Sequence, residues 1–222
     1  MKYNNTQIIN KTSHLMKKVI LLIAAILTFA GVSAQNNDSQ NIKRYKQLIK
    51  LNHQSYETCS KQVTSWGFTL NKNGIIDMFT MQMKPFASND TNDTTGFVLS
   101  VMNDKVIGMS LTVGGYNPAK MFARVQQFSN AQNAICVEEG LTEYVCAVKG
   151  SFKAKMPETH AKLIELLKEL DGNEVKQIVE MWKIPDKKVA ATFVYENKRY
   201  GKKKPRPDQV IELTISITDN RE

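Results

Sequence analysis

Residues 97–113 read FVLSVMNDKVIGMSLTV, two apolar runs separated by the dipeptide Asn103-Asp104. Asn and Asp tolerate the left-handed backbone that two-residue turns require, so this stretch predicts a β-hairpin with strands over 97–102 and 105–113. Because a hairpin joins antiparallel strands, the sheet around it is expected to be antiparallel. The expected register places two pairs of residues opposite each other, Val101 with Val106 and Leu99 with Gly108.

On both sides of this hairpin, the spacing of apolar residues switches between the helical and the extended period. The clearest strand covers 209–218, where Ile or Leu at 211, 213, 215 and 217 alternates with polar residues at 212, 214, 216 and 218. Further strands are predicted over 68–70, 75–83, 134–138, 142–149 and 189–195. Helical spacing predicts helices over 42–49, 55–66, 117–128, 157–170 and 175–182, with Ser55 and Asn117 as N-caps and Gly67 as a C-terminal stop.

This order of elements contains no alternation of strand, helix and parallel strand. The sequence therefore predicts an α+β fold: a single domain over 35–222, with a mainly antiparallel sheet of hairpins and helices packed on one face. Seven large side chains lie on the apolar sides of their predicted elements and form the predicted core: Trp66, Phe79, Phe122, Leu167, Trp182, Leu213 and Ile215.

The composition is that of a globular protein. The chain has 222 residues, of which 42% are hydrophobic and 23% are charged. These values exclude a disordered polymer, a collagen, a coiled coil and a polytopic membrane protein. The formal net charge of +9 predicts a basic surface somewhere on the molecule.

A targeting signal precedes the predicted domain. Residues 16–35 read MKKVILLIAAILTFAGVSAQ: two lysines, an apolar segment over 19–30, and small residues before Gln35. This pattern resembles a secretory signal peptide, and more specifically those of envelope proteins from Bacteroidetes-type bacteria. This segment of twelve residues, in which only Thr28 is polar, rises only about 18 Å as a helix, against roughly 30 Å of hydrocarbon, which argues against a membrane anchor.

We therefore expect cleavage between Ala34 and Gln35, so that residues 1–34 are removed. Within that segment, residues 1–15 are interpreted as an upstream extension and 16–34 as the signal proper. No cysteine follows the small residues, so the chain is not expected to be a lipoprotein. The expected location is the periplasm or the extracellular space.

Motifs for catalysis are not found in the sequence. HExxH, CxxC, GxSxG and Gly-rich phosphate loops do not occur, and His53 and His160 stand far apart among polar neighbours. Both histidines are expected at the surface. The sequence therefore predicts no catalytic residue, no metal ligand and no cofactor, and it favours a binding protein over an enzyme.

The three cysteines leave one question open. Cys59 shares a predicted helix face with apolar residues and is expected in the core. Cys136 and Cys146 are predicted on the two strands of a hairpin around Gly140-Leu141. A two-residue loop would point their side chains to opposite sides of the sheet, whereas a three-residue loop would allow a disulfide. We favour free, buried thiols.

The polar loop 89–96 suggests two kinds of site. It lacks the Gly and the Glu that an EF-hand calcium loop requires at its sixth and twelfth positions. Asp93-Thr94-Thr95 resembles the short motif of O-glycosylated Bacteroidetes envelope proteins. Because such a tripeptide is short, an unmodified flexible loop is the favoured interpretation, and glycosylation at Thr94 stays open.

A basic segment is the main candidate for function. Residues 197–206 read NKRYGKKKPR and connect two predicted strands, which places them at an exposed tip. The candidate anion-binding residues are Lys198, Arg199, Tyr200, Lys202, Lys203, Lys204 and Arg206.

The leading hypothesis is an exported, non-enzymatic binding domain of the bacterial envelope. Its 198–206 loop would contact an anionic polymer such as lipid A phosphate or acidic glycan. Nucleic acid is not the expected partner, because the loop lacks a series of aromatic side chains on which bases could stack. One alternative is a loop that only improves solubility. Another is a small periplasmic enzyme or inhibitor whose pocket is not visible in the sequence.

Overall fold

The computed structural model describes residues 38–78, 80–184 and 189–219. The predicted signal peptide, its cleavage site and Phe79 lie outside these residues. The described helices are α2 (Asp38–Ile49), α3 (Tyr56–Ser65), α4 (Pro118–Glu138) and α5 (His160–Glu169), with a short 3-10 turn η1 (Lys72–Gly74). The strands are β1 (Phe68–Leu70), β2 (Ile76–Met78), β3 (Met81–Ser88), β4 (Gly96–Met102), β5 (Lys105–Gly115), β6 (Glu143–Gly150), β7 (Val175–Lys183), β8 (Val189–Asn197) and β9 (Ile211–Asp219).

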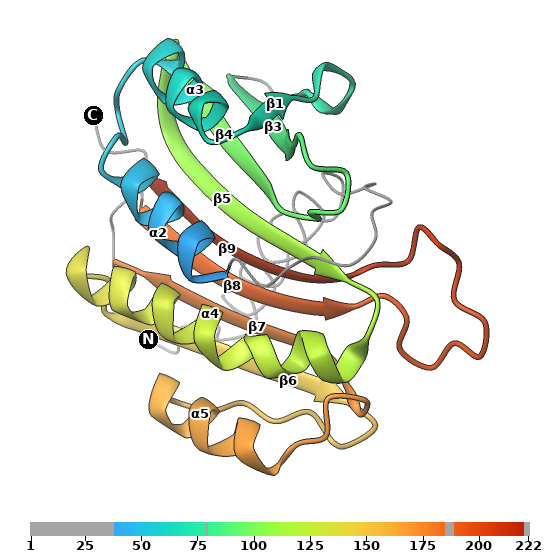
Figure 1. The fold of residues 1–222 in the computed structure, drawn as a ribbon. Coiled ribbons are helices and arrows are strands. Elements are labelled where there is room, and N and C mark those ends of the chain that lie inside the picture. The colour runs from blue at the N-terminus through green and yellow to red at the C-terminus, as the bar shows by residue number, and fades with distance from the viewer. Residues whose placement is uncertain (1–37, 79, 185–188, 220–222) are drawn as a thin grey trace.

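The strands form one antiparallel sheet in the order β1-β3-β4-β5-β9-β8-β7-β6, and β2 pairs with β3 beside this path. All four helices lie on the same side of the sheet (Figure 1), and the main core fills the space between the two layers. The predicted α+β architecture is therefore confirmed. The last strand in the sequence, β9, lies in the middle of the sheet between β5 and β8.

The β4–β5 hairpin forms as predicted, with one difference in register. Asn103 and Asp104 both have positive φ, 49° and 59°, as the tight turn requires. Val101 pairs with Val106 as predicted, but an irregularity between Ser100 and Val101 shifts the remaining pairs by one residue. Leu99 consequently lies opposite Met109, and Gly108 lies opposite Ser100.

Three predicted elements were wrong. Residues 75–83, predicted as one strand, are divided between β2 and the start of β3, which pair antiparallel. Residues 134–138, predicted as a strand, are the last turns of α4, which continues its buried face through Ile135 and Cys136. Residues 175–182, predicted as a helix, form strand β7. The apolar spacing suggested a helix because Glu180, the residue between Ile178 and Trp182 on the buried face, is charged and concealed the alternation.

The predicted core is largely confirmed. Leu213 and Ile215 are fully buried, while Trp182 and Leu167 are 3% and 8% exposed. Trp66 and Phe122 are half-buried and pack against this core. The helix-boundary predictions also hold: the Ser55 and Asn117 side chains cap α3 and α4, and Gly67 adopts a positive φ of 86°. In the part of the chain that the structure describes, no helix combines the length and hydrophobicity needed to span a bilayer.

Candidate functional site

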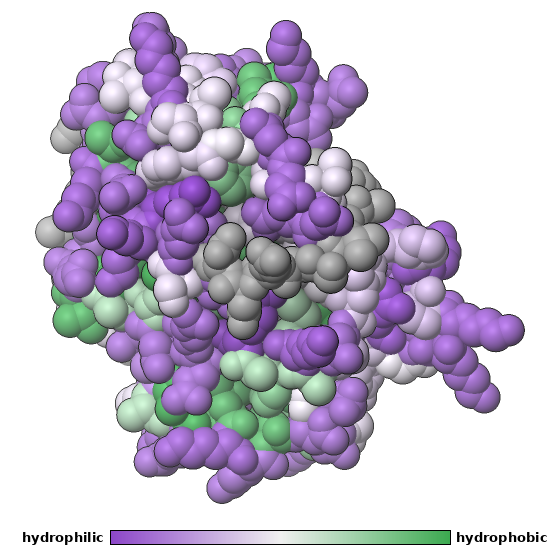
Figure 2. Space-filling view, in the orientation of Figure 1, coloured by the Kyte–Doolittle hydropathy of each residue, from purple (hydrophilic) through white to green (hydrophobic). Residues whose placement is uncertain are grey.

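The candidate anion-binding residues lie on the loop that connects β8 to β9. In Figure 1 this loop extends well beyond the end of the sheet, and in Figure 2 its surface is strongly hydrophilic. Asn197 ends β8 and Ile211 begins β9, so the loop covers 198–210. The structure divides its basic residues into a base, where the cations have partners within the protein, and a tip, where they have no ion-pair partner among the described residues.

Lys198 belongs to the base. Its ammonium lies 2.7 Å from a carboxylate oxygen of Glu212, whose side chain is only 6% exposed. Burial raises the pKa of Glu212 to about 7, while Lys198 opposes this shift and the neighbouring Glu196 adds to it. Glu196 faces Glu212 across the β8–β9 pair, so Lys198 neutralises a site where two carboxylates meet. The charge of Lys198 is therefore paired with a carboxylate of the protein itself.

Arg199 and Arg206 are also held at the base. The Arg199 guanidinium donates to the main-chain oxygen of Gln209 at 3.3 Å and lies over the Tyr116 ring at 5.3 Å. Arg206 is 3.2 Å from Asp208, and its main-chain N–H donates to the Gln209 side chain at 2.9 Å. The Arg206 pair is largely exposed and is therefore weak.

The tip carries three consecutive lysines. Lys202, Lys203 and Lys204 are exposed, and none of them forms an ion pair within the described ranges. Tyr200 is half-buried beside them. Of the seven predicted site residues, the structure thus leaves these three lysines as the cations that are free to meet a ligand.

A second polar group lies inside the protein and was not predicted. The side chain of Glu180 on β7 is fully buried, and Ser129 on α4 donates a hydrogen bond to it. Tyr144 on β6 donates to Glu180 at 2.8 Å, and Nδ1 of His160 on α5 lies 2.9 Å from the same oxygen. Nε2 of His160 faces Asn130 at 3.0 Å. We call Glu180, Ser129, Tyr144 and His160 the Glu180 cluster.

The Glu180 cluster does not have the geometry of a hydrolase triad. In a triad, one histidine nitrogen faces the serine and the other faces the carboxylate. Here Nδ1 of His160 faces both, at 3.4 Å from Ser129 and 2.9 Å from Glu180, and Ser129 donates to the carboxylate itself. Because Ser129 is also fully buried, no substrate can reach its hydroxyl. The cluster instead connects α4, α5, β6 and β7 through buried hydrogen bonds.

This arrangement corrects the expectation that His160 is a surface residue, because its side chain is only 14% exposed. His53 is more accessible, at 39%, and lies 3.4 Å from Asp219. Burial and the Glu180 carboxylate together raise the pKa of Tyr144, which keeps its hydroxyl protonated as a donor. One sequence signal could have revealed the cluster: a carboxylate at an inward position of an alternating strand requires buried donors.

All three cysteines are buried free thiols. Cys59 lies in the core as predicted. Cys136 and Cys146 are free and buried, as favoured, but Cys136 is on helix α4 and Cys146 on strand β6, so the predicted hairpin that would have allowed a disulfide does not exist. Burial raises the pKa of Cys59 to about 11 and that of Cys146 to about 12, and it also raises the pKa of Cys136. Burial therefore disfavours the thiolate, the reactive form, of all three cysteines in the folded protein.

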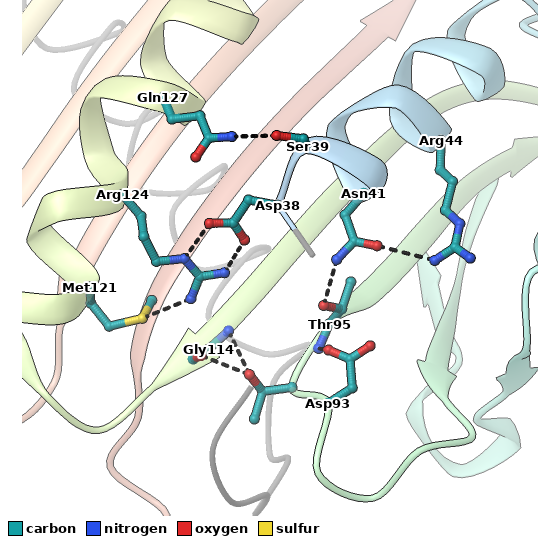
Figure 3. A network of polar contacts seen from close by, with 11 residues as sticks. Asp38, Ser39, Asn41, Arg44, Asp93, Thr95, Gly114, Met121, Arg124 and Gln127 are labelled. Atoms are coloured by element: carbon teal, nitrogen blue, oxygen red, sulfur yellow. Dashed lines mark hydrogen bonds and ion pairs between the residues drawn. The ribbon is translucent and has the colours of Figure 1, made fainter. Parts of the chain in front are cut away.

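A polar seam joins the start of α2 to α4 and to the 89–96 loop (Figure 3). Asp38 accepts two hydrogen bonds from Arg124, one of them at 2.7 Å, and its side chain is 3% exposed. Asn41 donates to the Thr95 hydroxyl at 3.1 Å. These contacts fix the first turn of α2 against the rest of the domain.

The same seam restrains Thr94, the candidate glycosylation residue. Its hydroxyl donates to the main-chain oxygen of Gly114 at 2.7 Å and accepts from the N–H of Gly114 at 3.2 Å. A glycan on this oxygen would remove the donated bond and crowd the contact with β5. The geometry therefore favours the unmodified residue, although the loop is more ordered at Thr94 than the sequence suggested.

The described residues offer no grouped metal ligands and one shallow hollow. Among residues 38–78, 80–184 and 189–219, no three His, Cys, Asp or Glu side chains are grouped so as to hold a metal ion. A shallow hollow of about 270 Å³ lies between the β2–β3 and β4–β5 turns. It is lined by Asp77, Met78, Thr80, Met81, Gln82, Val101, Asn103 and Asp104. Comparison of the chain with protein-family models, with curated proteins and with solved structures found no match.

Proposed function

We propose that this protein is an exported, non-enzymatic binding domain of the bacterial envelope that contacts anionic polymers through the tip of the β8–β9 loop. The observation that carries the proposal is the presence of three adjacent exposed lysines on a projecting loop, without ion-pair partners in the described chain. The signal-like sequence before residue 35 supports export.

The chemistry of the tip favours an extended anionic surface over a single small anion. The loop projects beyond the end of the sheet, so its three lysines are placed to meet an extended surface. Each lysine near an anionic surface contributes about 1 kcal/mol, so three contribute about 3 kcal/mol, or roughly a hundredfold in affinity. The interaction is expected to be unselective and to weaken as salt is added, because the Debye length is only about 8 Å at physiological ionic strength.

Binding to vesicles and to an acidic polysaccharide tests this proposal. Vesicles containing phosphatidylglycerol, and alginate, are expected to retain the wild-type protein at low salt, while neutral phosphatidylcholine vesicles are not. The variant K202Q/K203Q/K204Q is expected to lose this binding. Equal binding by the two proteins, or binding that ignores salt, would show that the tip is only a solvated loop.

A charge-matched control separates the tip from general basicity. Lys43, Lys50 and Lys105 are exposed, and Lys105 begins β5 at the end of the sheet opposite to the β8–β9 loop. The variant K43Q/K50Q/K105Q loses the same charge and is expected to bind nearly as well as the wild type. If the control loses as much binding as the tip variant, net charge rather than the loop is responsible.

Export has its own test. N-terminal sequencing of the protein from the envelope fraction is expected to begin at Gln35. Retention in the cytoplasm, or an N-terminus upstream of Val32, would contradict the signal-peptide interpretation and move the search for a partner to another compartment.

A further inference from the structure

We propose that the β8–β9 loop is a site of limited proteolysis, cut after Lys202 and after Lys203 by serine proteases that select basic side chains, and that the cut protein stays assembled. This inference does not depend on the proposed anion binding, because it concerns the backbone of the loop. It follows from the contacts of each basic residue and from the position of β9 in the sheet.

The backbone is least restrained at the tip. Local turns close both ends of the loop, where the N–H of Lys202 donates to Arg199 and that of Gln209 donates to Arg206. Between these turns, residues 203–205 make no backbone hydrogen bond to any other described residue. Exposed polar loop tips of this kind are the preferred sites of proteolytic nicking, because little structure must open before a protease can bind the chain.

Four of the six basic residues of the loop are not expected to be cleavage sites, because of their contacts or of the residue that follows them. The side chains of Lys198 and Arg199 are engaged by Glu212 and by Gln209 and Tyr116, so they are not free to enter a specificity pocket. Lys204 and Arg206 are each followed by a proline, Pro205 and Pro207. Proline has no N–H and a fixed φ, which opposes productive binding of the bond that precedes it. Lys202 and Lys203 are exposed and are followed by ordinary residues.

The reaction is hydrolysis of one peptide bond. The protease's serine attacks the carbonyl carbon of Lys202 or Lys203, and the amine of the next residue leaves with a proton. Water then releases the acyl group, so the products carry a new carboxylate and a new amino group. The positive side chains of the tip remain, now divided between two chain ends.

The sheet explains why the products stay together. The C-terminal piece carries β9, which pairs with β5 over Gly108–Gly115 and with β8 over Val189–Asn197. Ile211, Leu213 and Ile215 of β9 are fully buried in the main core. A strand that is paired on both sides and buried in this way does not leave without unfolding the domain.

A second exposed segment serves as an internal comparison. Lys153 is exposed in the irregular segment between β6 and α5. There, the N–H of Ser151 donates to Glu174, and Lys155 exchanges two backbone hydrogen bonds with Val148 on β6. Because these backbone hydrogen bonds to strand β6 and to Glu174 flank Lys153 on both sides, a protease must first detach the segment, and cleavage after Lys153 is expected to be slow.

Brief digestion of the purified protein with trypsin tests the proposal in the absence of any polyanion. Mass spectrometry of the denatured products is expected to show C-terminal pieces that begin at Lys203 and Lys204. Size exclusion without denaturant is expected to show one species of unchanged size. Release of the C-terminal piece under native conditions, or cutting after Lys198 or Arg199 as fast as after Lys203, would overturn the inference.

Two variants sharpen the result. K202Q/K203Q is expected to abolish both loop cuts. P205A is expected to add a new cut after Lys204, because Pro205 is the only feature that opposes cleavage after this residue. Circular dichroism before digestion checks that both variants are folded. Continued cutting at the loop in K202Q/K203Q, or a P205A digest identical to that of the wild type, would contradict the assignment of the cut sites.

Discussion

The Glu180 cluster and the tip of the β8–β9 loop are both rich in ionisable groups, but they use charge in opposite ways. Glu180 is fully buried, and three side chains from three other elements contact its carboxylate oxygens. Lys202, Lys203 and Lys204 are exposed, and no ion pair restrains them within the described residues. A buried charge with many partners holds elements together, whereas exposed charges without partners are available to another molecule.

The largest effect is expected from Glu180→Ala. This change leaves the hydroxyls of Ser129 and Tyr144 and the ring of His160 without their shared acceptor inside the protein. Leaving a buried donor without its acceptor costs about 1–3 kcal/mol of unfolding free energy, so the loss of the shared acceptor by two hydroxyls is expected to cost about 2–6 kcal/mol. Urea denaturation measures this loss. Glu165→Ala, at an exposed position of α5, is the control and should change stability by less than about 0.5 kcal/mol.

A smaller loss is expected from Lys198→Gln at the base of the loop. The change removes the cation that lies 2.7 Å from the buried Glu212 carboxylate. At pH 8.5 the cost is expected to be about 1–3 kcal/mol, the range for leaving a buried polar group without its partner. A loss of unfolding free energy below about 0.5 kcal/mol at this pH would show that Lys198, like the lysines of the tip, has no stabilising partner.

The cost of Lys198→Gln is expected to depend on pH. The pKa of Glu212 in the folded protein, about 7, lies above its ordinary value of 4.5. The neutral acid is therefore favoured by folding, and this contribution is complete at low pH and is lost as the pH rises through 7. Because Lys198 limits that loss, Lys198→Gln should destabilise the protein more at pH 8.5 than at pH 5.5. Equal costs at both pH values would contradict the pairing.

The rate at which a reagent labels the cysteines tests whether burial lowers the reactivity of their thiols. Burial raises the pKa of Cys59 from its ordinary value of 9.0 to about 11, so its thiolate is about a hundredfold scarcer at pH 8 than in an unfolded chain. Labelling with a thiol reagent at pH 8 is expected to be at least that much slower in the native state than in urea. Three thiols should react in urea without reductant, and a count of one would reveal a disulfide.

The smallest effect on stability is expected at the tip. K202Q/K203Q/K204Q removes three exposed cations that have no ion pair within the described chain, so its unfolding free energy should match that of the wild type within about 0.5 kcal/mol. The same denaturation experiment as for Lys198→Gln provides the comparison. A loss as large as that of Lys198→Gln would mean that the tip lysines have structural partners.

Several features could be predicted from short stretches of sequence. The Asn103-Asp104 turn, the caps at Ser55 and Asn117, and the alternation in 211–217 each depend on residues within a few positions of one another. Hairpin turns and helix caps are local interactions, so their signals are complete in a short segment. The position of the basic segment between two strands followed from the same patterns.

Other features depended on residues that the chain brings together from afar. Helix α4 continues through 134–138, where the sequence predicted a strand, because Ile135 and Cys136 face the core that other elements complete. The strand β7 was concealed by Glu180, whose donor Ser129 stands 51 positions away in the sequence. Neither partner carries a local sign of the other, so a pattern of apolar spacing could not identify the buried charge.

The β8–β9 loop combines one feature that the sequence predicts with another that depends on tertiary contacts. Its composition alone indicated a cluster of positive charge, since Lys and Arg are charged wherever they lie. Only the folded sheet decided that Lys198 is neutralised by Glu212, that Arg199 lies against Tyr116, and that the lysines at 202–204 project alone. The physical reason is that the charge of a side chain is a property of the residue, whereas its availability depends on which partners the tertiary structure places within a few ångströms of it.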